Sequence, residues 1–201
     1  APSAGLLLAA AFPGPDIGWL AFVALMPLLW AWRTSGPGRA ALLGFIAGMA
    51  FFGLHLWWAI YFGAVAIVPF VAFEAVYWAG TGAVIGGLGR LRIRSPWVTA
   101  AAWVVFESLR TRWPLGGFAW AQAGAALHDI EPMRALASWG GVPLVTFVVV
   151  ACNALLLDLA LGRRSGQSRA RTRLLAAGGL VAILVVVAVG TAARSDPTPT
   201  G

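Results

Sequence analysis

The sequence predicts an all-α, polytopic membrane protein, a transmembrane helix bundle with about seven spans. Of its 201 residues, 60% are hydrophobic and only 10% are charged, and the mean hydropathy is +0.84. A water-soluble core of this size could not enclose so much apolar surface. The apolar residues also form successive runs that are separated by short stretches rich in arginine, glycine and proline. We therefore interpret the runs as membrane spans joined by short loops.

The first apolar run, within residues 1–12, is too short to cross a bilayer, which takes ~20 helical residues. No charged region precedes it, so it does not have the pattern of a signal peptide, and we interpret it as a span truncated at its start. The remaining spans are expected at about residues 18–32, 40–62, 65–88, 96–109, 134–161 and 174–193, with a long loop at 110–133.

Two features predict how these spans pack and bend. Gly44 and Gly48 are four residues apart in the third span, and Gly82 and Gly86 repeat this spacing in the fourth. Small residues at this spacing let two membrane helices approach closely. The sixth span is long enough either to tilt or to break at Gly140-Gly141-Val142-Pro143.

The arginines are distributed unevenly between alternate loops. Cytoplasmic loops of membrane proteins carry the excess of basic residues, so the side with ten arginines should be cytoplasmic. The loop at 110–133 and the C-terminal end then lie outside the cytoplasm. The ten are Arg33, Arg39, Arg90, Arg92, Arg94, Arg163, Arg164, Arg169, Arg171 and Arg173, and the four on the other side are Arg110, Arg112, Arg134 and Arg194.

Composition excludes several other functions. All 14 basic residues are arginines in short loops, with no polar basic face that could follow a nucleic-acid duplex. The single cysteine, Cys152, excludes an intramolecular disulfide, and we interpret it as a small core residue. His55 and His128 are too far apart in sequence, and too unaccompanied, to indicate a metal site. We expect no cofactor and no metal.

The stretch from Trp103 to Gln122 joins an apolar run to charges, glycines and aromatic rings. Glu107 and Arg110 lie three residues apart, on one face of a helix, so we expect them to pair and to orient the following loop. The residues from Pro114 to Gly117 cannot prolong the helix. This pattern indicates a helix that ends at a membrane surface and continues as an ordered loop.

Two further carboxylates lie in apolar spans, where acidic residues are costly and are candidates for function. Asp158 is expected to pair with Arg163, about one turn away. Glu74 has no basic residue near it in sequence. We expect it to face the helix bundle, either protonated or hydrogen-bonded to Tyr77, Trp78 or His55.

Glu107-Ser108-Leu109-Arg110, followed by the run from Gly117 to Gly124, resembles the E-x-L-R … G-F-P-W-x-x-x-G signature in the membrane part of apolipoprotein N-acyltransferases. The resemblance implies a multi-pass enzyme of the bacterial plasma membrane. Such enzymes move an acyl chain from a phospholipid to the amino group of the lipid-modified N-terminal cysteine of a lipoprotein. The resemblance extends in order over nearly the whole chain. It includes Phe12-Pro13, Trp19, the run Met26-Pro27-Leu28-Leu29, Gly44-Phe45, Gly48, Phe51-Phe52-Gly53, Trp58, and the run from Gly140 to Phe147.

The chain departs from the family pattern in places. Ala119 stands where proline is usual, Ala125-Ala126-Leu127 replaces a Tyr-Ser-Gln-like run, and Trp57 and Ile60 replace an Asn and a Tyr. The resemblance implies that the catalytic Glu, Lys and Cys belong to a nitrilase-like domain after the seventh span. None of the three can be assigned in this chain, so we expect residues 1–201 alone to be inactive.

Aromatic residues gather on the predicted outer side, where they can fix the depth of the protein in the bilayer. Some of them can also wall a lipid-accessible groove beneath the nitrilase-like domain. The aromatic residues are Trp57, Trp58, Tyr61, Trp113, Phe118 and Trp120, and the candidate substrate-binding residues are Trp58, Glu107, Arg110, Phe118, Trp120 and Gln122.

One alternative is a non-catalytic membrane scaffold for a polyprenol-phosphate mannosyltransferase, since some high-GC bacteria join a similar membrane region to such an enzyme. The replaced run at Ala125-Ala126-Leu127 fits this relaxed role. A small transporter fits less well, because the chain lacks paired broken helices with a polar midplane.

Overall fold

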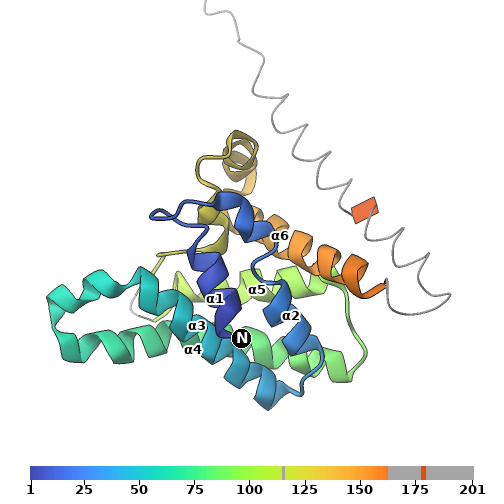
Figure 1. The fold of residues 1–201 in the computed structure, drawn as a ribbon, viewed down its shortest axis with the longest axis horizontal. Coiled ribbons are helices and arrows are strands. Elements are labelled where there is room, and N and C mark those ends of the chain that lie inside the picture. The colour runs from blue at the N-terminus through green and yellow to red at the C-terminus, as the bar shows by residue number, and fades with distance from the viewer. Residues whose placement is uncertain (115, 163–177, 180–201) are drawn as a thin grey trace, which may run out of the picture.

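The described part of the chain is mostly helical and contains no β-strand, which confirms the predicted all-α fold (Figure 1). The computed structural model describes residues 1–114, 116–162 and 178–179. Its α-helices are α1 (Pro2–Ala9), α2 (Met26–Arg33), α3 (Pro37–His55), α4 (Ala64–Arg90), α5 (Pro96–Arg110) and α6 (Glu131–Gly162). Three short 3-10 helices lie between them, η1 (Gly18–Phe22), η2 (Trp57–Phe62) and η3 (Ala123–Leu127).

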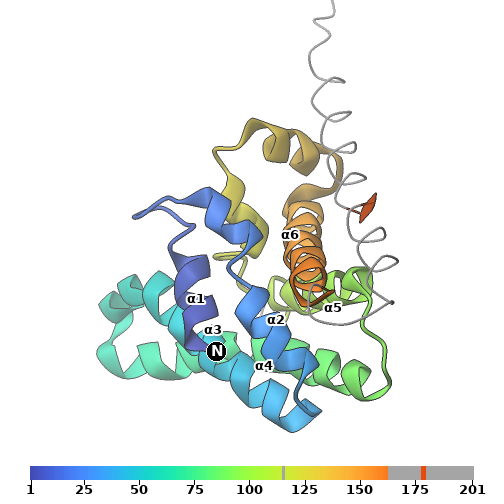
Figure 2. The same ribbon diagram turned by 45° about the vertical axis from the view of Figure 1, so that its right-hand side comes forward.

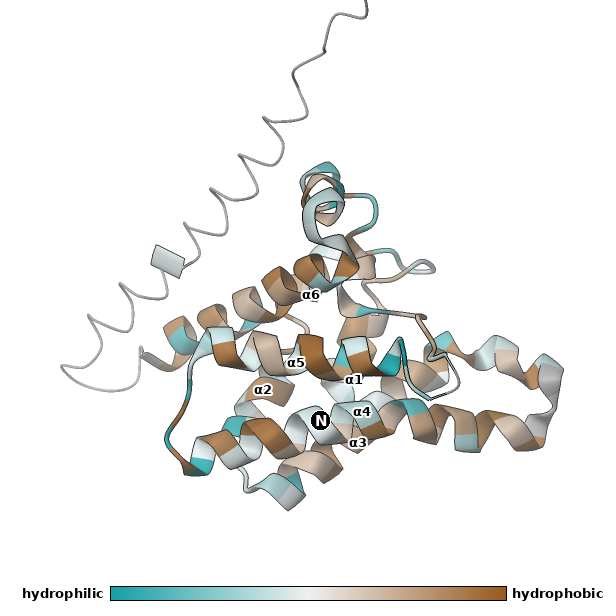
Figure 3. Cartoon of the chain, turned by 180° about the vertical axis from the view of Figure 1, so that it is seen from behind, coloured by the Kyte–Doolittle hydropathy of each residue, from teal (hydrophilic) through white to brown (hydrophobic). Residues whose placement is uncertain are grey.

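Three of the described helices are long and apolar enough to cross a membrane, namely Pro37–His55, Val65–Arg90 and Glu131–Leu161. They correspond to the third, fourth and sixth predicted spans, and α5, with 15 residues, corresponds to the fifth. Hydrophobic residues recur along all of these helices (Figure 3), as expected of a multi-pass membrane protein. The seventh predicted span, 174–193, lies outside the described residues apart from 178–179.

The predicted second span, 18–32, is not one helix. It is divided into η1 and α2, with residues 23–25 between them. The side chain of Asn153 in α6 completes the hydrogen bonding at this break, because Leu25 N–H donates to its Oδ1 at 2.9 Å and its Nδ2 donates to the carbonyl of Ala21 at 2.7 Å. A break in a membrane helix is tolerated where a neighbouring helix satisfies the freed backbone groups in this way.

Helices α3 and α4 lie side by side as an antiparallel hairpin in Figures 1 and 2. Glycines make this close approach possible. A Cβ on Gly44 would collide with the carbonyl of Trp78, and one on Gly82 would collide with the carbonyl of Ala40. The structure thus confirms that the two predicted glycine pairs permit close helix packing.

Helix α6 is broken at Gly140 and Gly141, one of the two outcomes that the sequence allowed. Gly141 has a φ of 67°, a left-handed conformation that suits glycine. The segments before and after the break run in different directions (Figure 2). The break leaves residues 142–162 free to pack against α5.

Two arginine-bearing links lie at the same end of the bundle. Gly36, before α3, packs against the guanidinium of Arg90 at the end of α4. The same end holds an ion pair between Arg33 of α2 and Asp158 of α6. Asp158 thus pairs with Arg33, 125 residues away in sequence, and its expected partner, Arg163, lies outside the described residues.

Candidate functional site

The residues after α5 fold back against the end of that helix, and we call residues 117–122 the loop strip. Gly117 permits the reversal, because its φ is +75° and a Cβ there would collide with the backbone of Thr111. The amide of Phe118 then donates to the carbonyl of Arg110 at 2.9 Å. Gly117 and Phe118, which begin the loop strip, are thus held against the end of α5.

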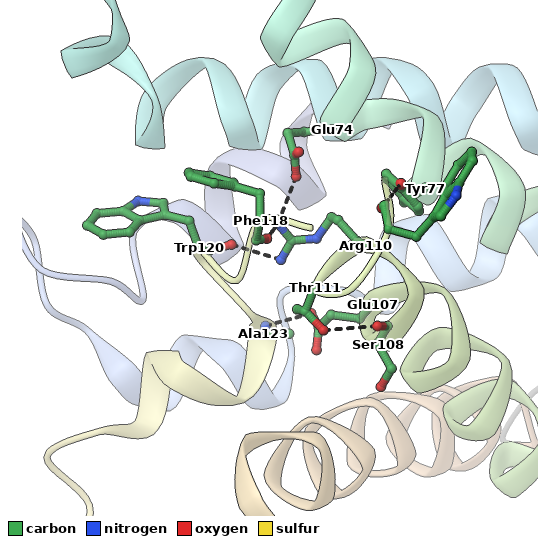
Figure 4. Close-up of polar contacts among 10 residues, drawn as sticks. Glu74, Tyr77, Glu107, Ser108, Arg110, Thr111, Phe118, Trp120 and Ala123 are labelled. Atoms are coloured by element: carbon green, nitrogen blue, oxygen red, sulfur yellow. Dashed lines mark hydrogen bonds and ion pairs between the residues drawn. The ribbon is translucent and has the colours of Figure 1, made fainter. Parts of the chain in front are cut away.

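Arg110, the last residue of α5, binds three acceptors with its guanidinium (Figure 4). Its Nη1 donates to Glu74 Oε2 at 2.8 Å and to the carbonyl of Phe118 at 3.0 Å, and its Nη2 donates to the carbonyl of Trp120 at 2.8 Å. The guanidinium also lies 5.0 Å from the centre of the Phe52 ring, which is cation–π distance. Only 2% of Arg110 is exposed, so this charge depends on its partners inside the protein.

The expected ion pair between Glu107 and Arg110 is wrong. The partner of Arg110 is Glu74, which comes from α4 and lies 36 residues earlier in the sequence. Glu74 was expected to be protonated or hydrogen-bonded to Tyr77, Trp78 or His55. It instead forms this ion pair with Arg110. Because α4 packs across the end of α5, the arginine reaches a neighbouring helix rather than its own.

Glu107 instead joins η3, which follows the loop strip, to α6. Its Oε1 accepts from the amide of Ala123 at 2.9 Å, and its Oε2 accepts from the hydroxyl of Thr146 at 2.7 Å. The same hydroxyl oxygen accepts from the amide of Gly124 at 2.9 Å. A Cβ on Gly124 would lie 2.6 Å from the amide nitrogen of Thr146, so only glycine fits. A buried carboxylate with several donors is well satisfied.

Trp58, Phe118 and Trp120 form a cluster that we call the aromatic wall. The ring centres of Trp58 and Trp120 are 5.5 Å apart, and those of Trp58 and Phe118 are 6.4 Å apart. Phe70 of α4 supports the wall from behind, with its ring 5.1 Å from that of Phe118 and nearly perpendicular to it. Such edge-to-face contacts stabilise aromatic clusters beyond the area they bury.

Two cavities adjoin the aromatic wall. The larger, of about 690 Å³, lies between the end of α1, the end of α3 and the loop strip, and its lining includes Leu6, Phe12, Leu54, His55, Trp58 and Trp120. The smaller, of about 390 Å³, is lined by Trp58, Ala59, Ala66, Phe70 and Phe118. Trp58 borders both. A largely apolar cavity with a few polar groups is the usual form of a site for an amphipathic molecule.

Comparison with known proteins identifies the family. The profile described as "Apolipoprotein N-acyltransferase N-terminal domain" matches residues 4–155. The chain belongs to this family.

Named relatives agree with this assignment to the apolipoprotein N-acyltransferase family. The chain is 32% identical to the apolipoprotein N-acyltransferase of Methylococcus capsulatus over 176 residues, which cover 81% of this chain and 34% of that protein. It is 31% identical to the Geobacter metallireducens protein of the same name over 173 residues, 79% of this chain and 32% of the relative. The chain thus spans about a third of the length of these relatives. The matches described here give no support to the mannosyltransferase scaffold.

Within this apolipoprotein N-acyltransferase domain, five of the six predicted substrate-binding residues fall into two groups. Trp58 and Trp120 line the larger cavity, and Phe118 lines the smaller one. Glu107 and Arg110 are buried; Arg110 hydrogen-bonds the loop strip, and Glu107 hydrogen-bonds Ala123 at the start of η3. Gln122 is half-buried and precedes η3. The substrate contacts of all six stay a prediction.

Sequence reasoning did not find several residues of the site. His55 lines the larger cavity, with Nδ1 3.0 Å from the carbonyl of Phe51 and its ring packed on Phe12. Thr146 lies in the run from Gly140 to Phe147 that carried part of the family resemblance, which is the signal that could have found it. The residues of α1 gave no such signal, because only the fold brings them to the cavity.

His128 lies close to two carboxylates, one of which is distant from it in sequence. Its Nε2 lies 3.2 Å from Asp129 Oδ1, and Asp16 brings a second carboxylate to this exposed group.

Cys152 is buried in α6, as expected for a small core residue.

Proposed function

We propose that this chain is the membrane domain of an enzyme that transfers an acyl chain from a phospholipid to the N-terminal diacylglyceryl-cysteine of bacterial lipoproteins. In this proposal the domain anchors and orients the catalytic part of the enzyme. It also supplies a groove that holds an acyl chain of the phospholipid donor. The family membership supports the reaction, and the groove is supported by the geometry of the site.

The larger cavity is the single observation that carries this proposal. Its volume of about 690 Å³ is bounded by apolar side chains of α1 and α3 and by Trp58 and Trp120. Such a lining suits a hydrocarbon chain, because burying each CH₂ group contributes about 0.8 kcal/mol. The family signature residues hold one side of the cavity in place, since Arg110 binds the carbonyl of Trp120.

The orientation of the domain is part of the proposal. We assign the end that holds Arg33 and Arg90 to the cytoplasmic side, because basic residues are enriched in cytoplasmic loops. The loop at 110–133 and the larger cavity then face outward in the bacterial plasma membrane. Cysteines placed at Gly38 and at Arg112 in a Cys152→Ser background test this assignment in intact cells. A membrane-impermeant maleimide should label position 112 and leave position 38 unlabelled; the reverse result would overturn the orientation.

A cavity-filling substitution tests the groove. Ala10 lines the larger cavity, and Ala160 lines a separate groove of about 250 Å³ between α2 and α6, so the two sites allow a matched comparison. We expect Ala10→Phe to weaken retention of dioleoyl phosphatidylglycerol by roughly tenfold in native mass spectrometry of the purified protein, since each ~1.4 kcal/mol of lost contact is tenfold. Ala160→Phe should leave the retention of this phospholipid unchanged. Equal lipid retention by both variants would exclude the groove.

Residues 1–201 alone should not transfer acyl chains. The family reaction needs a thiolate nucleophile, a base and a lysine, yet the sequence contains no lysine and its one cysteine is buried in α6. Mixing the purified chain with phospholipid and a diacylated lipopeptide should therefore give no triacylated product by mass spectrometry. Formation of that product would contradict the assignment of catalysis to another part of the enzyme.

A further inference from the structure

One face of α4 holds the segment that follows α5. Phe70, Glu74 and Tyr77 are spaced at i, i+4 and i+7, which places them on the same side of a helix. Phe70 packs on Phe118 and the Tyr77 hydroxyl donates to the carbonyl of Trp113, both in this segment, while Glu74 binds Arg110, the last residue of α5. Helix α4 therefore determines where the loop strip lies.

Among the described residues, Glu74 is the only acidic residue that forms an ion pair with Arg110. Both side chains are almost fully enclosed, with 1% of the arginine side chain and 2% of the glutamate side chain exposed. The other nearby carboxylate, Glu107, is occupied by Ala123 and Thr146. Removing the charge of Glu74 would leave a buried guanidinium without a counter-charge, which strongly favours rearrangement toward water.

The carbonyls that Arg110 binds belong to the residues that border the two cavities. Phe118 lines the smaller cavity and Trp120 lines the larger one, and their ring centres are 6.3 Å apart. A guanidinium that is fixed in direction can hold both carbonyls at once, because its donors form a rigid fork. A displaced guanidinium would release both residues together.

We infer that Glu74 is a positioning residue of the groove: through Arg110 it fixes the loop strip, and thereby the aromatic wall that separates the two cavities. Glu74 lies outside the sequence motifs that carry the family resemblance. The inference rests on the proposed function for the meaning of the groove as an acyl-chain site. The position of the wall can be measured without any acyl transfer.

Hydrogen–deuterium exchange of the loop strip tests the inference, because the amide of Phe118 is hydrogen-bonded to the carbonyl of Arg110 only while the strip is folded back. We expect Glu74→Gln to accelerate exchange in peptides covering residues 117–122 by roughly tenfold or more, which corresponds to the loss of one charged hydrogen bond. Retention of dioleoyl phosphatidylglycerol should fall in the same variant.

Asp158→Asn is the matched control. It also removes an intramembrane carboxylate from an ion pair, with Arg33, but this pair joins α2 to α6 at the opposite end of the bundle. It should leave both strip exchange and lipid retention unchanged. If Glu74→Gln leaves strip exchange at the level of Asp158→Asn, or if all helices exchange faster by the same factor, the inference is overturned.

A second variant covers the case in which Glu74→Gln does not fold. Glu74→Asp keeps the charge but shortens the reach toward Arg110, so strip exchange should accelerate by a smaller factor while α3 stays protected; unchanged strip exchange would count against the inference.

The two proposals can fail separately. Lipid retention that survives Ala10→Phe refutes the groove alone, whereas strip exchange that is insensitive to both Glu74 variants refutes the positioning role alone.

Discussion

The carboxylate of Glu107 accepts a hydrogen bond of 2.7 Å from the hydroxyl of Thr146, 39 residues further along the chain. The same hydroxyl oxygen accepts from the amide of Gly124, so one side chain of α6 satisfies both α5 and η3. Thr146→Val should therefore destabilise the protein by about 1–3 kcal/mol, because buried polar groups lose their partner. Unfolding in detergent, followed by circular dichroism, measures this change.

Thr146→Ser is the control for this prediction, since it retains the hydroxyl and removes only a methyl group. It should recover most of the stability that Thr146→Val loses. Equal destabilisation by both substitutions would show that the methyl group, rather than the hydrogen bonds, matters at this position.

Arg110 and Arg112 allow a comparison within one segment. Arg110→Lys should destabilise the protein by about 1–3 kcal/mol, because a compact ammonium cannot reach Glu74 and both carbonyls in the way that a planar guanidinium does. Arg112 is exposed, and its guanidinium donates to the carbonyl of Ser108. Arg112→Lys should change the unfolding free energy by less than about 0.5 kcal/mol, and a comparable loss in both variants would argue against the shared guanidinium.

The sequence predicted the helical class and allowed for a break at Gly140 and Gly141, because these depend on hydropathy and on local backbone preferences. It also placed Trp58, Phe118 and Trp120 among six aromatic residues on one side of the membrane, and the structure brings the rings of these three together. It did not predict the partner of Arg110. Sequence spacing reveals neighbours on one helix, whereas Glu74 reaches Arg110 only after α4 has packed across α5.

The cavities show the same limit. The larger cavity joins residues of α1, the end of α3 and the loop strip, and no local pattern links segments so distant in sequence. The division of the second predicted span had a different cause. Its composition is continuously apolar, but Asn153 of α6 compensates the break between η1 and α2, so a tertiary contact prevails over the helical preference of the segment.

The glycines between α3 and α4 predict a large effect of added volume. A Cβ on Gly82 would collide with the carbonyl of Ala40 and lie 2.7 Å from Trp32 Nε1. Gly82→Val should destabilise the protein by about 1–3 kcal/mol or more, since a packed interface cannot accept extra carbon atoms. Gly87, five residues later in α4, has open space around it. Gly87→Ala should be neutral or slightly stabilising, and thermal unfolding in detergent distinguishes the two variants.

Asn153 is predicted to be the polar residue on which the break between η1 and α2 depends. It accepts from Leu25 N–H and donates to the carbonyls of Ala21 and Val149. Asn153→Leu preserves the approximate volume but leaves the groups of Leu25 and Ala21 without partners. We expect a loss of about 2–5 kcal/mol in unfolding free energy, the sum of two unsatisfied buried groups.

Thr81 provides the comparison for Asn153, because it is also buried and polar, and its hydroxyl donates to the carbonyl of Tyr77 within its own helix. Thr81→Val should cost less than about 1 kcal/mol, since that carbonyl keeps its helical partner. If Asn153→Leu were as mild as Thr81→Val, then η1 and α2 would hold their arrangement without α6. The side-chain amide would in that case be dispensable for the fold around the larger cavity.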